Sequence, residues 1–244
     1  MITPKLSFEF FDSKVDYISG SVGLLSVLIK LYKETKDNDI SRYIQNLTLQ
    51  LISKKKEILS MDITYAHGCI GVANVFIKVY ELFGESSPNL RATIDELHYT
   101  INRGYVVQME NNDISWCKGI SGFLLYYSTY YSYFHDYKSK QKIETGVKKI
   151  KRILLTTGAK DDSLCHGNIG ILDVLLEIKR NAYSDEALEF VIGILKDRIF
   201  DLYNKLEFKS GLSNGAYNTS LFLGLSGKQY IVDRINLSIS SILN

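Results

Sequence analysis

The sequence predicts an all-helical protein built from repeats, and three observations support that fold class. Ten of the 17 glycines fall into five Gly-x-x-Gly units, which are followed by apolar runs. Only two prolines occur, Pro4 and Pro88, so long stretches of the chain are free to be helical. No convincing alternation of apolar and polar residues with a period of two occurs, which argues against strands.

The glycine units recur at a regular spacing. Their first glycines stand at positions 20, 68, 119, 167 and 224, which are 48, 51, 48 and 57 residues apart. Periods of this size are typical of helical repeat arrays. Glycine at the start of a helix lets a neighbouring backbone approach closely, so we expect most of these glycines to serve packing. The units are Gly20/Gly23, Gly68/Gly71, Gly119/Gly122, Gly167/Gly170 and Gly224/Gly227.

Two kinds of segment alternate along the chain. The runs after the glycine units are apolar almost all round and predict buried inner helices, whereas the segments between them have one polar face and predict outer helices. Inner helices are expected over residues 24–32, 72–83, 123–134 and 171–178, and outer helices over 41–59, 89–101, 141–155 and 185–206.

Length and composition indicate one large globular domain over residues 1–244. With 45% apolar residues, 23% charged residues and a net charge of +2, the chain gives no sign of a nucleic-acid or membrane partner. It has no signal-peptide core and no apolar run of about 20 residues, so we expect a cytoplasmic protein without a membrane span. Three cysteines cannot form a full disulfide framework and suggest metal binding, catalysis or burial.

Five reactive side chains stand one to four residues before the first glycine of a unit. They are Asp16, His67, Cys117, Cys165 and His166. If the repeats are equivalent, all five lie at the N-terminal ends of the inner helices. Unpaired backbone N–H groups and the helix dipole favour anions there, including thiolates.

Two of these cysteines and one histidine form a ligand set suited to zinc. Cys117, Cys165 and His166 would leave the fourth tetrahedral position open, as in catalytic zinc sites. Buried residues without a metal are the alternative, because cysteine is among the most buried residue types. The spacing by itself leaves both readings open.

Other candidate residues fit packing or surface roles better. Cys69 is expected in the core, and His98 and His135 on packed or exposed helix faces. The tyrosine-rich stretch 126–137 has the spacing of helix faces and predicts core packing with peripheral hydroxyls. The lysines at 54–56 and 148–149 are expected on solvated faces.

The residues around the glycine units resemble the lanthionine synthetase C-like family. Ser-Trp-Cys-Lys-Gly at 115–119 and Ser-Leu-Cys-His-Gly at 163–167 resemble its paired zinc signatures. Ala-His-Gly at 66–68 looks like its catalytic turn, and Asp16 stands where the family has an aspartate at an inner-helix start. The segment 238–243 looks like the tail of the class II, bifunctional enzymes.

The resemblance implies an α/α toroid that binds Zn²⁺ and acts as a cyclase in lantibiotic biosynthesis. The implied substrate is a dehydrated precursor peptide, in which a cysteine thiol adds to dehydroalanine or dehydrobutyrine to form a thioether. His67 would be the general acid that protonates the enolate, and Asp16 would orient or charge-stabilise it. The implied location is the bacterial cytoplasm, with membrane association only through a biosynthetic complex.

The sequence departs from the family pattern in two ways. The family toroid has seven repeats and five are found, so the first two repeats and any dehydratase domain are expected to be missing. An open array would expose apolar ends, which predicts self-association or binding of a separate dehydratase or N-terminal fragment. Asp113 also stands where many members carry an arginine, and Lys118 is a conjectural replacement for that charge.

Two other functions remain open on the sequence. The chain could be a non-catalytic remnant that binds zinc and peptide, or one subunit of a split cyclase. A toroid enzyme of another chemistry, such as a prenyltransferase or glycosidase, is the weaker alternative. A glycosidase needs two facing carboxylates, and the helix starts offer only Asp16.

Overall fold

The chain is described by a computed structural model over residues 14–84, 89–181, 183–205, 207–213, 216 and 218–244. Within these residues all regular structure is helical, which confirms the predicted fold class. The inner helices are α1 (Ser21–Thr35), α4 (Cys69–Phe83), α6 (Ile120–Phe134), α8 (Asn168–Asn181) and α10 (Leu225–Leu237). The outer helices are α2 (Asn38–Ser53), α3 (Lys55–Ser60), α5 (Leu90–Glu110), α7 (Tyr137–Thr156) and α9 (Glu186–Asn204).

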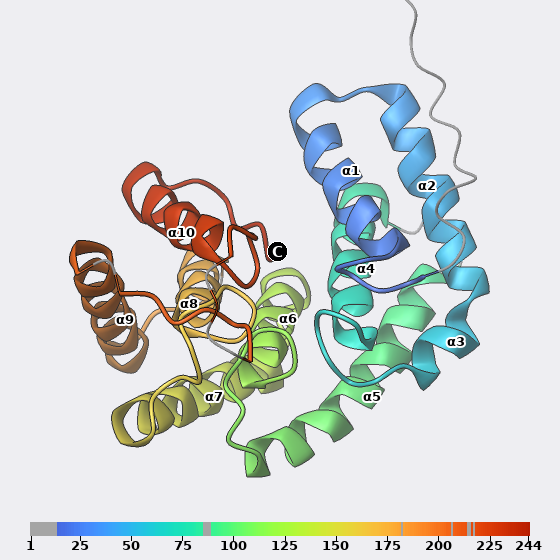
Figure 1. The fold of residues 1–244 in the computed structure, drawn as a ribbon. Coiled ribbons are helices and arrows are strands. Elements are labelled where there is room, and N and C mark those ends of the chain that lie inside the picture. Colours follow the sequence, from blue (N-terminus) through green and yellow to red (C-terminus); the bar gives the residue numbers. More distant parts are fainter. Residues whose placement is uncertain (1–13, 85–88, 182, 206, 214–215, 217) are drawn as a thin grey trace, which may run out of the picture.

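The helices form an arc of two layers. Each inner helix contacts the next one in the order α1, α4, α6, α8 and α10, and α2, α5, α7 and α9 pack against the inner helices that precede them. Figure 1 shows the outer helices outside this arc and the C-terminal end of the chain between its two arms. The predicted alternation of inner and outer helices is therefore confirmed. The expected outer helix 41–59 is divided at Lys54, and α5 continues nine residues past the expected end at Ile101.

A chain of backbone hydrogen bonds joins the loops that precede the inner helices. It involves the residue two positions before the first glycine of each unit. The N–H of Ile18 donates to Ala66 O at 3.2 Å, and the N–H of Ala66 donates to Cys117 O at 3.3 Å. The N–H of Cys117 donates to Cys165 O at 3.3 Å, and that of Cys165 to Phe222 O at 2.9 Å. Equivalent positions of successive repeats are thus held side by side.

The second glycine of a unit is required by close packing between repeats. A Cβ atom on Gly122 would lie 2.3 Å from the carbonyl oxygen of Trp116 in its own loop and 2.9 Å from Cβ of Tyr65 in the preceding loop. The Tyr65 and Trp116 rings are 5.2 Å apart by their centroids, and both are buried beneath the loops. The expectation that the glycines serve packing is confirmed at this position.

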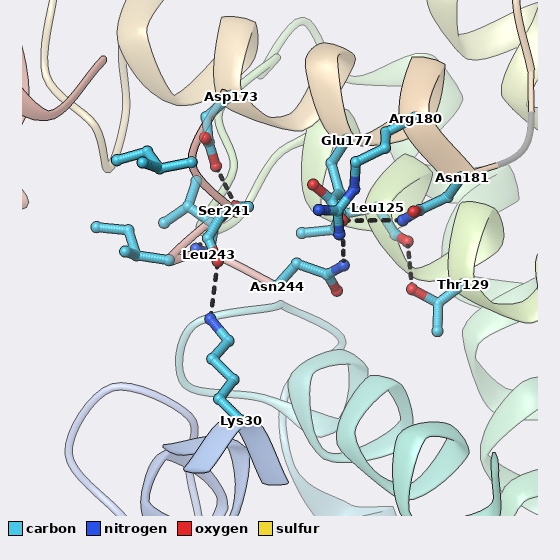
Figure 2. Close-up of polar contacts among 12 residues, drawn as sticks. Lys30, Leu125, Thr129, Asp173, Glu177, Arg180, Asn181, Ser241, Leu243 and Asn244 are labelled. Atoms are coloured by element: carbon cyan, nitrogen blue, oxygen red, sulfur yellow. Dashed lines mark hydrogen bonds and ion pairs between the residues drawn. The ribbon is translucent and has the colours of Figure 1, made fainter. Parts of the chain in front are cut away.

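The segment after α10 returns into the middle of the arc and bridges its two arms. Lys30 of α1 donates to the Ser241 carbonyl at 2.7 Å, and Asn74 of α4 donates to the Asn244 side chain at 3.0 Å. The Asn244 amide in turn donates to Glu177 of α8 at 2.9 Å. Figure 2 shows this segment between Lys30 on one side and the α8 side chains on the other. The first and fourth inner helices are therefore connected through the tail.

A buried arginine anchors the tail to α8 and α10. Arg234 makes an ion pair with Asp173 through Nε at 2.5 Å and donates from Nη2 to Glu177 at 2.9 Å. Its guanidinium also donates to the carbonyl of Ile239, and Asp173 accepts the Ser241 hydroxyl. Burial of both carboxylates is offset by these partners, since an unpaired buried charge would cost several kcal/mol.

The apolar surface of α1 is less exposed than the sequence suggested. Val22, Leu25, Leu28 and Ile29 are all buried, whereas Val27 is 61% exposed. The exposed apolar surface of this end helix is therefore limited to residues such as Val27 and Leu31, the second of which is 45% exposed. The physical reason is that α2 and α4 pack against α1 and the tail adds contacts from inside the arc.

The side chains outside the motifs agree with their expected roles, with one exception. Cys69 is buried in the core, and Tyr126 and Tyr127 are buried as expected. His98 stacks on Tyr130 with 3.8 Å between ring centroids, which confirms a packing role. Lys149 was expected on a solvated face, and this expectation is wrong.

Lys149 belongs to α7, and its buried side chain reaches the C-terminal end of the preceding outer helix, α5. Its ammonium donates to the carbonyls of Gln108 and Met109, each at 2.8 Å, and to that of Asn111. These are carbonyl groups at the C-terminus of α5, which lack partners within the helix. Lys149 therefore fixes the start of the loop that leads to Cys117.

No helix among the described residues is both long and apolar enough to cross a membrane.

Replacing Gly122 by alanine should destabilise the protein. The added Cβ meets backbone and the base of a buried ring, neither of which can move freely, so the cost should be about 1–3 kcal/mol. Gly193 is the matched control, because it lies in α9 with open space around its Cβ position, and alanine there should stabilise by about 0.5–1 kcal/mol. Urea unfolding measures both. Equal stabilities of the two variants would refute the close packing described for Gly122.

Candidate metal site and acid–base pair

Two cysteines and a histidine converge at the N-terminal ends of α6 and α8. The ligand atoms of Cys117, Cys165 and His166 all lie within 4.8 Å of one another. The Cys165 sulfur is 3.6 Å from Nε2 of His166. Around a tetrahedral zinc with ordinary bond lengths, a sulfur and a nitrogen ligand are separated by roughly 3.6 Å. The three residues predicted as ligands are therefore brought together, and this group could hold a metal ion.

The backbone ladder explains why the two sulfurs meet. Cys117 and Cys165 occupy the same position in adjacent repeats, and the Cys117 N–H donates to the Cys165 carbonyl. Two residues after each cysteine stands the glycine that immediately precedes its inner helix. At such helix starts the partial positive charge of the free N–H groups stabilises a thiolate.

The contacts among the three side chains favour the charged forms of Cys117 and His166 and the neutral form of Cys165. A hydrogen bond with Cys165 lowers the pKa of the Cys117 thiol against the effect of burial, and His166 lowers it further. The same bond and burial raise the pKa of Cys165. The hydrogen bond to the Cys117 sulfur raises the pKa of His166. A divalent cation would replace these protons, since metal ligands bind in deprotonated form.

Asp16 and His67 form a second pair in the neighbouring repeats. Oδ2 of Asp16 lies 3.5 Å from Nδ1 of His67, and the His67 side chain is 56% exposed. Burial raises the pKa of Asp16, but hydrogen bonds from Ser19 and the contact with His67 outweigh it, so the net pKa is lowered. Asp16 is therefore ionised at neutral pH. His67 follows Ala66, whose N–H donates to the Cys117 carbonyl, so this pair adjoins the cysteine site.

Three serines share the repeat position of Asp16, four residues before the first glycine. Asp16 accepts the N–H of Ser19 at 2.7 Å, and the hydroxyls of Ser115 and Ser163 accept the N–H groups three residues after them. Ser220 accepts the Leu223 N–H in the same way. The capping contact thus belongs to the repeat, and the negative charge is what distinguishes Asp16.

Sequence reasoning missed Ser115. Its hydroxyl lies 3.8 Å from the Cys117 sulfur and accepts the N–H of Gly119 at 3.1 Å. It supports the cysteine loop and contacts a candidate ligand at the same time. Its position in the repeat could have identified it, because Ser115 stands four residues before the first glycine of its unit, as Asp16 does.

Asp113 has a structural role in the loop before Cys117. Its carboxylate accepts the Ser115 N–H at 2.8 Å, and its carbonyl accepts the Ile120 N–H at 3.0 Å. Asp161 makes the same side-chain contact to Ser163 at 2.8 Å in the next repeat. Asp113 therefore shapes the turn, and its carboxylate cannot take over the role of a positively charged residue.

Comparisons with known proteins agree with this architecture. Residues 2–241 match the family described as lanthionine synthetase C-like protein. Among solved structures, the chain is similar to nisin cyclase, with a TM-score of 0.63 and 15% sequence identity over 92% of this chain and 66% of that chain. No curated protein matches the sequence significantly.

The structural likeness shows the fold and no more, because the sequence identity is low. It confirms the α/α toroid class predicted from the sequence. The chain spans just under two thirds of the length of that cyclase structure, 66%. Since the family match extends over nearly all of its residues, the chain belongs to the lanthionine synthetase C-like family.

Proposed function

We propose that this protein is a zinc-dependent peptide cyclase that forms lanthionine or methyllanthionine thioether rings. The observation that carries the proposal is the convergence of Cys117, Cys165 and His166 next to the Asp16–His67 pair. The family membership and the nisin cyclase fold support the same activity. The substrate would be a precursor peptide that contains cysteine together with dehydroalanine or dehydrobutyrine.

The donor set fits zinc. Two sulfurs and one imidazole nitrogen are ligands that zinc prefers, and three protein ligands leave one tetrahedral position for a substrate atom. Cys117, Cys165 and His166 would hold the ion. When bound there, zinc supplies Lewis-acid stabilisation of a substrate thiolate at neutral pH.

The remaining chemistry is proton transfer, and His67 is placed for it. The substrate thiolate attacks the β-carbon of the dehydro residue, a carbon–sulfur bond forms, and the π electrons move to the carbonyl oxygen. The α-carbon of this enolate then takes a proton from the His67 imidazolium. The half-exposed ring is accessible to a peptide, whereas Asp16 is nearly covered.

Asp16 would act as a positioning residue. Its ionised carboxylate lies 3.5 Å from Nδ1 of His67 and so orients the imidazole ring. The Ser19 N–H and hydroxyl hold that carboxylate in place. The opposite nitrogen, Nε2, is then free to face the substrate.

Replacing Cys165 by alanine should abolish zinc binding and cyclisation together. Two remaining ligands cannot hold the ion with the affinity of three, so zinc should fall from roughly one per chain to a trace. Cys69→Ala is the matched control, because Cys69 is a buried cysteine outside the cluster and should keep its zinc. Metal analysis of the purified variants measures the zinc content per chain and so tests this prediction. Full zinc in the Cys165 variant would remove the site from consideration.

Two variants test the acid–base pair separately from the metal. His67→Asn should keep the zinc and lower the cyclisation rate by roughly 100- to 10,000-fold, the usual contribution of a general acid. Asp16→Ser should also slow cyclisation, because His67 loses the carboxylate that orients its ring.

Serine at position 16 keeps the capping contact that Ser115 and Ser163 make in their repeats, so folding should be unaffected. Wild-type kinetics in both variants would exclude the pair from the mechanism. A zinc-loaded wild-type protein that binds the dehydrated peptide without cyclising it would instead indicate a binding module.

A further inference from the structure

A polar pocket of about 620 Å³ adjoins the candidate metal site. His166 lines it, together with Lys118, Lys160 and Lys209. The three lysines come from three loops that are far apart in the sequence, before α6, before α8 and before α10. Tertiary structure therefore gathers three positive charges beside one metal ligand.

The backbone of each lysine is held by the repeat loops. The Lys118 N–H donates to the Ser115 hydroxyl at 3.4 Å. Lys209 forms two backbone contacts to Asp162: its N–H donates to the carboxylate and its carbonyl accepts the Asp162 N–H, both at 2.9 Å. Lys160 directly precedes Asp161, whose carbonyl accepts the Asn168 N–H at the start of α8. The main chain at or next to each of the three lysines is thus fixed by these contacts.

The three ammonium groups have no acidic partner among the described residues. Within the described part of the chain no ion pair or hydrogen bond involves their Nζ atoms, whereas exposed lysines such as Lys55 and Lys179 each face a glutamate. Asp113 is the acidic side chain among the described residues that line the pocket, and its Oδ1 already accepts the Ser115 N–H. The pocket therefore carries excess positive charge.

The charges are close enough to act on the metal ligands. The charge of Lys118 acts to lower the pKa of Cys165, and that of Lys160 acts to lower the pKa of His166. In both groups stronger effects, led by the contact with Cys117, raise the pKa overall. The pocket therefore adds positive charge beside the candidate ligands.

We propose that this pocket binds an acidic side chain of the peptide substrate, close in sequence to the cysteine that forms the ring. The inference rests on the proposed cyclase function and adds a specificity to it. An aspartate or glutamate in the pocket would pair with Lys118, Lys160 and Lys209 and set the direction in which the peptide crosses the site. Exposed ion pairs are individually weak, so the three lysines act together.

The test compares three peptides that differ at one position beside the cysteine: glutamate, glutamine or lysine. The zinc-loaded wild-type protein should cyclise the glutamate peptide with a kcat/KM roughly tenfold above the glutamine peptide and further above the lysine peptide. In the triple variant Lys118→Gln, Lys160→Gln, Lys209→Gln this preference should vanish while zinc content stays unchanged. Raising the salt concentration should reduce the wild-type preference, because the charges are exposed.

Lys148→Gln is the matched control, since it removes an exposed lysine from α7, an outer helix. It should keep the wild-type preference. Equal kcat/KM values for the three peptides, or a glutamate preference that survives in the triple variant, would overturn the inference and leave the cyclase function standing.

A binding measurement covers the case in which no peptide is cyclised. That result would contradict the proposed function. Fluorescence anisotropy of the labelled peptides would then test the acidic-residue pocket independently of cyclisation. Tighter, salt-sensitive binding of the glutamate peptide that the triple variant loses supports the acidic-residue pocket. Equal binding of all three peptides refutes it.

Discussion

The structure depends on the backbone hydrogen bonds that connect the loops before the inner helices. In the first four repeats the N–H two residues before the first glycine finds its acceptor in the next repeat, so the loops cannot shift independently. Two cysteines at this position in adjacent repeats must therefore lie next to each other. The same bonds place Ala66, and with it His67, beside Cys117. The candidate site follows from the register of the repeats and from which side chains occupy it.

Equivalent positions share a structural contact and differ in chemistry. Asp16, Ser115 and Ser163 all cap the same backbone N–H of their loops, but Asp16 adds a negative charge next to His67. Asp113 and Asp161 likewise hold the same turn in consecutive repeats. A functional role is therefore best sought where a repeat position departs from its equivalents. The histidines at 67 and 166 share one such position, which is serine, lysine or leucine in the other repeats.

The interior of the arc is held by a network separate from this loop end. Arg234, Asp173 and Glu177 bind the segment after α10, and Lys30 of α1 contacts the same segment. These contacts connect the arms of the array without using a residue of the candidate metal site. The loop end thus keeps its histidine, its lysines and its pocket available to a peptide.

The sequence by itself determined the helical repeat, the inner and outer layers and the members of the candidate metal site and of the Asp16–His67 pair. These features are local in the chain, because glycine spacing and helical periodicity can be counted along it. Tertiary structure decided the rest. Lys149 reaches carbonyls about 40 residues away, and the tail contacts α1 more than 200 residues away. The lysine pocket likewise joins three loops. No local pattern predicts such contacts, because they depend on which loops the folded array brings together.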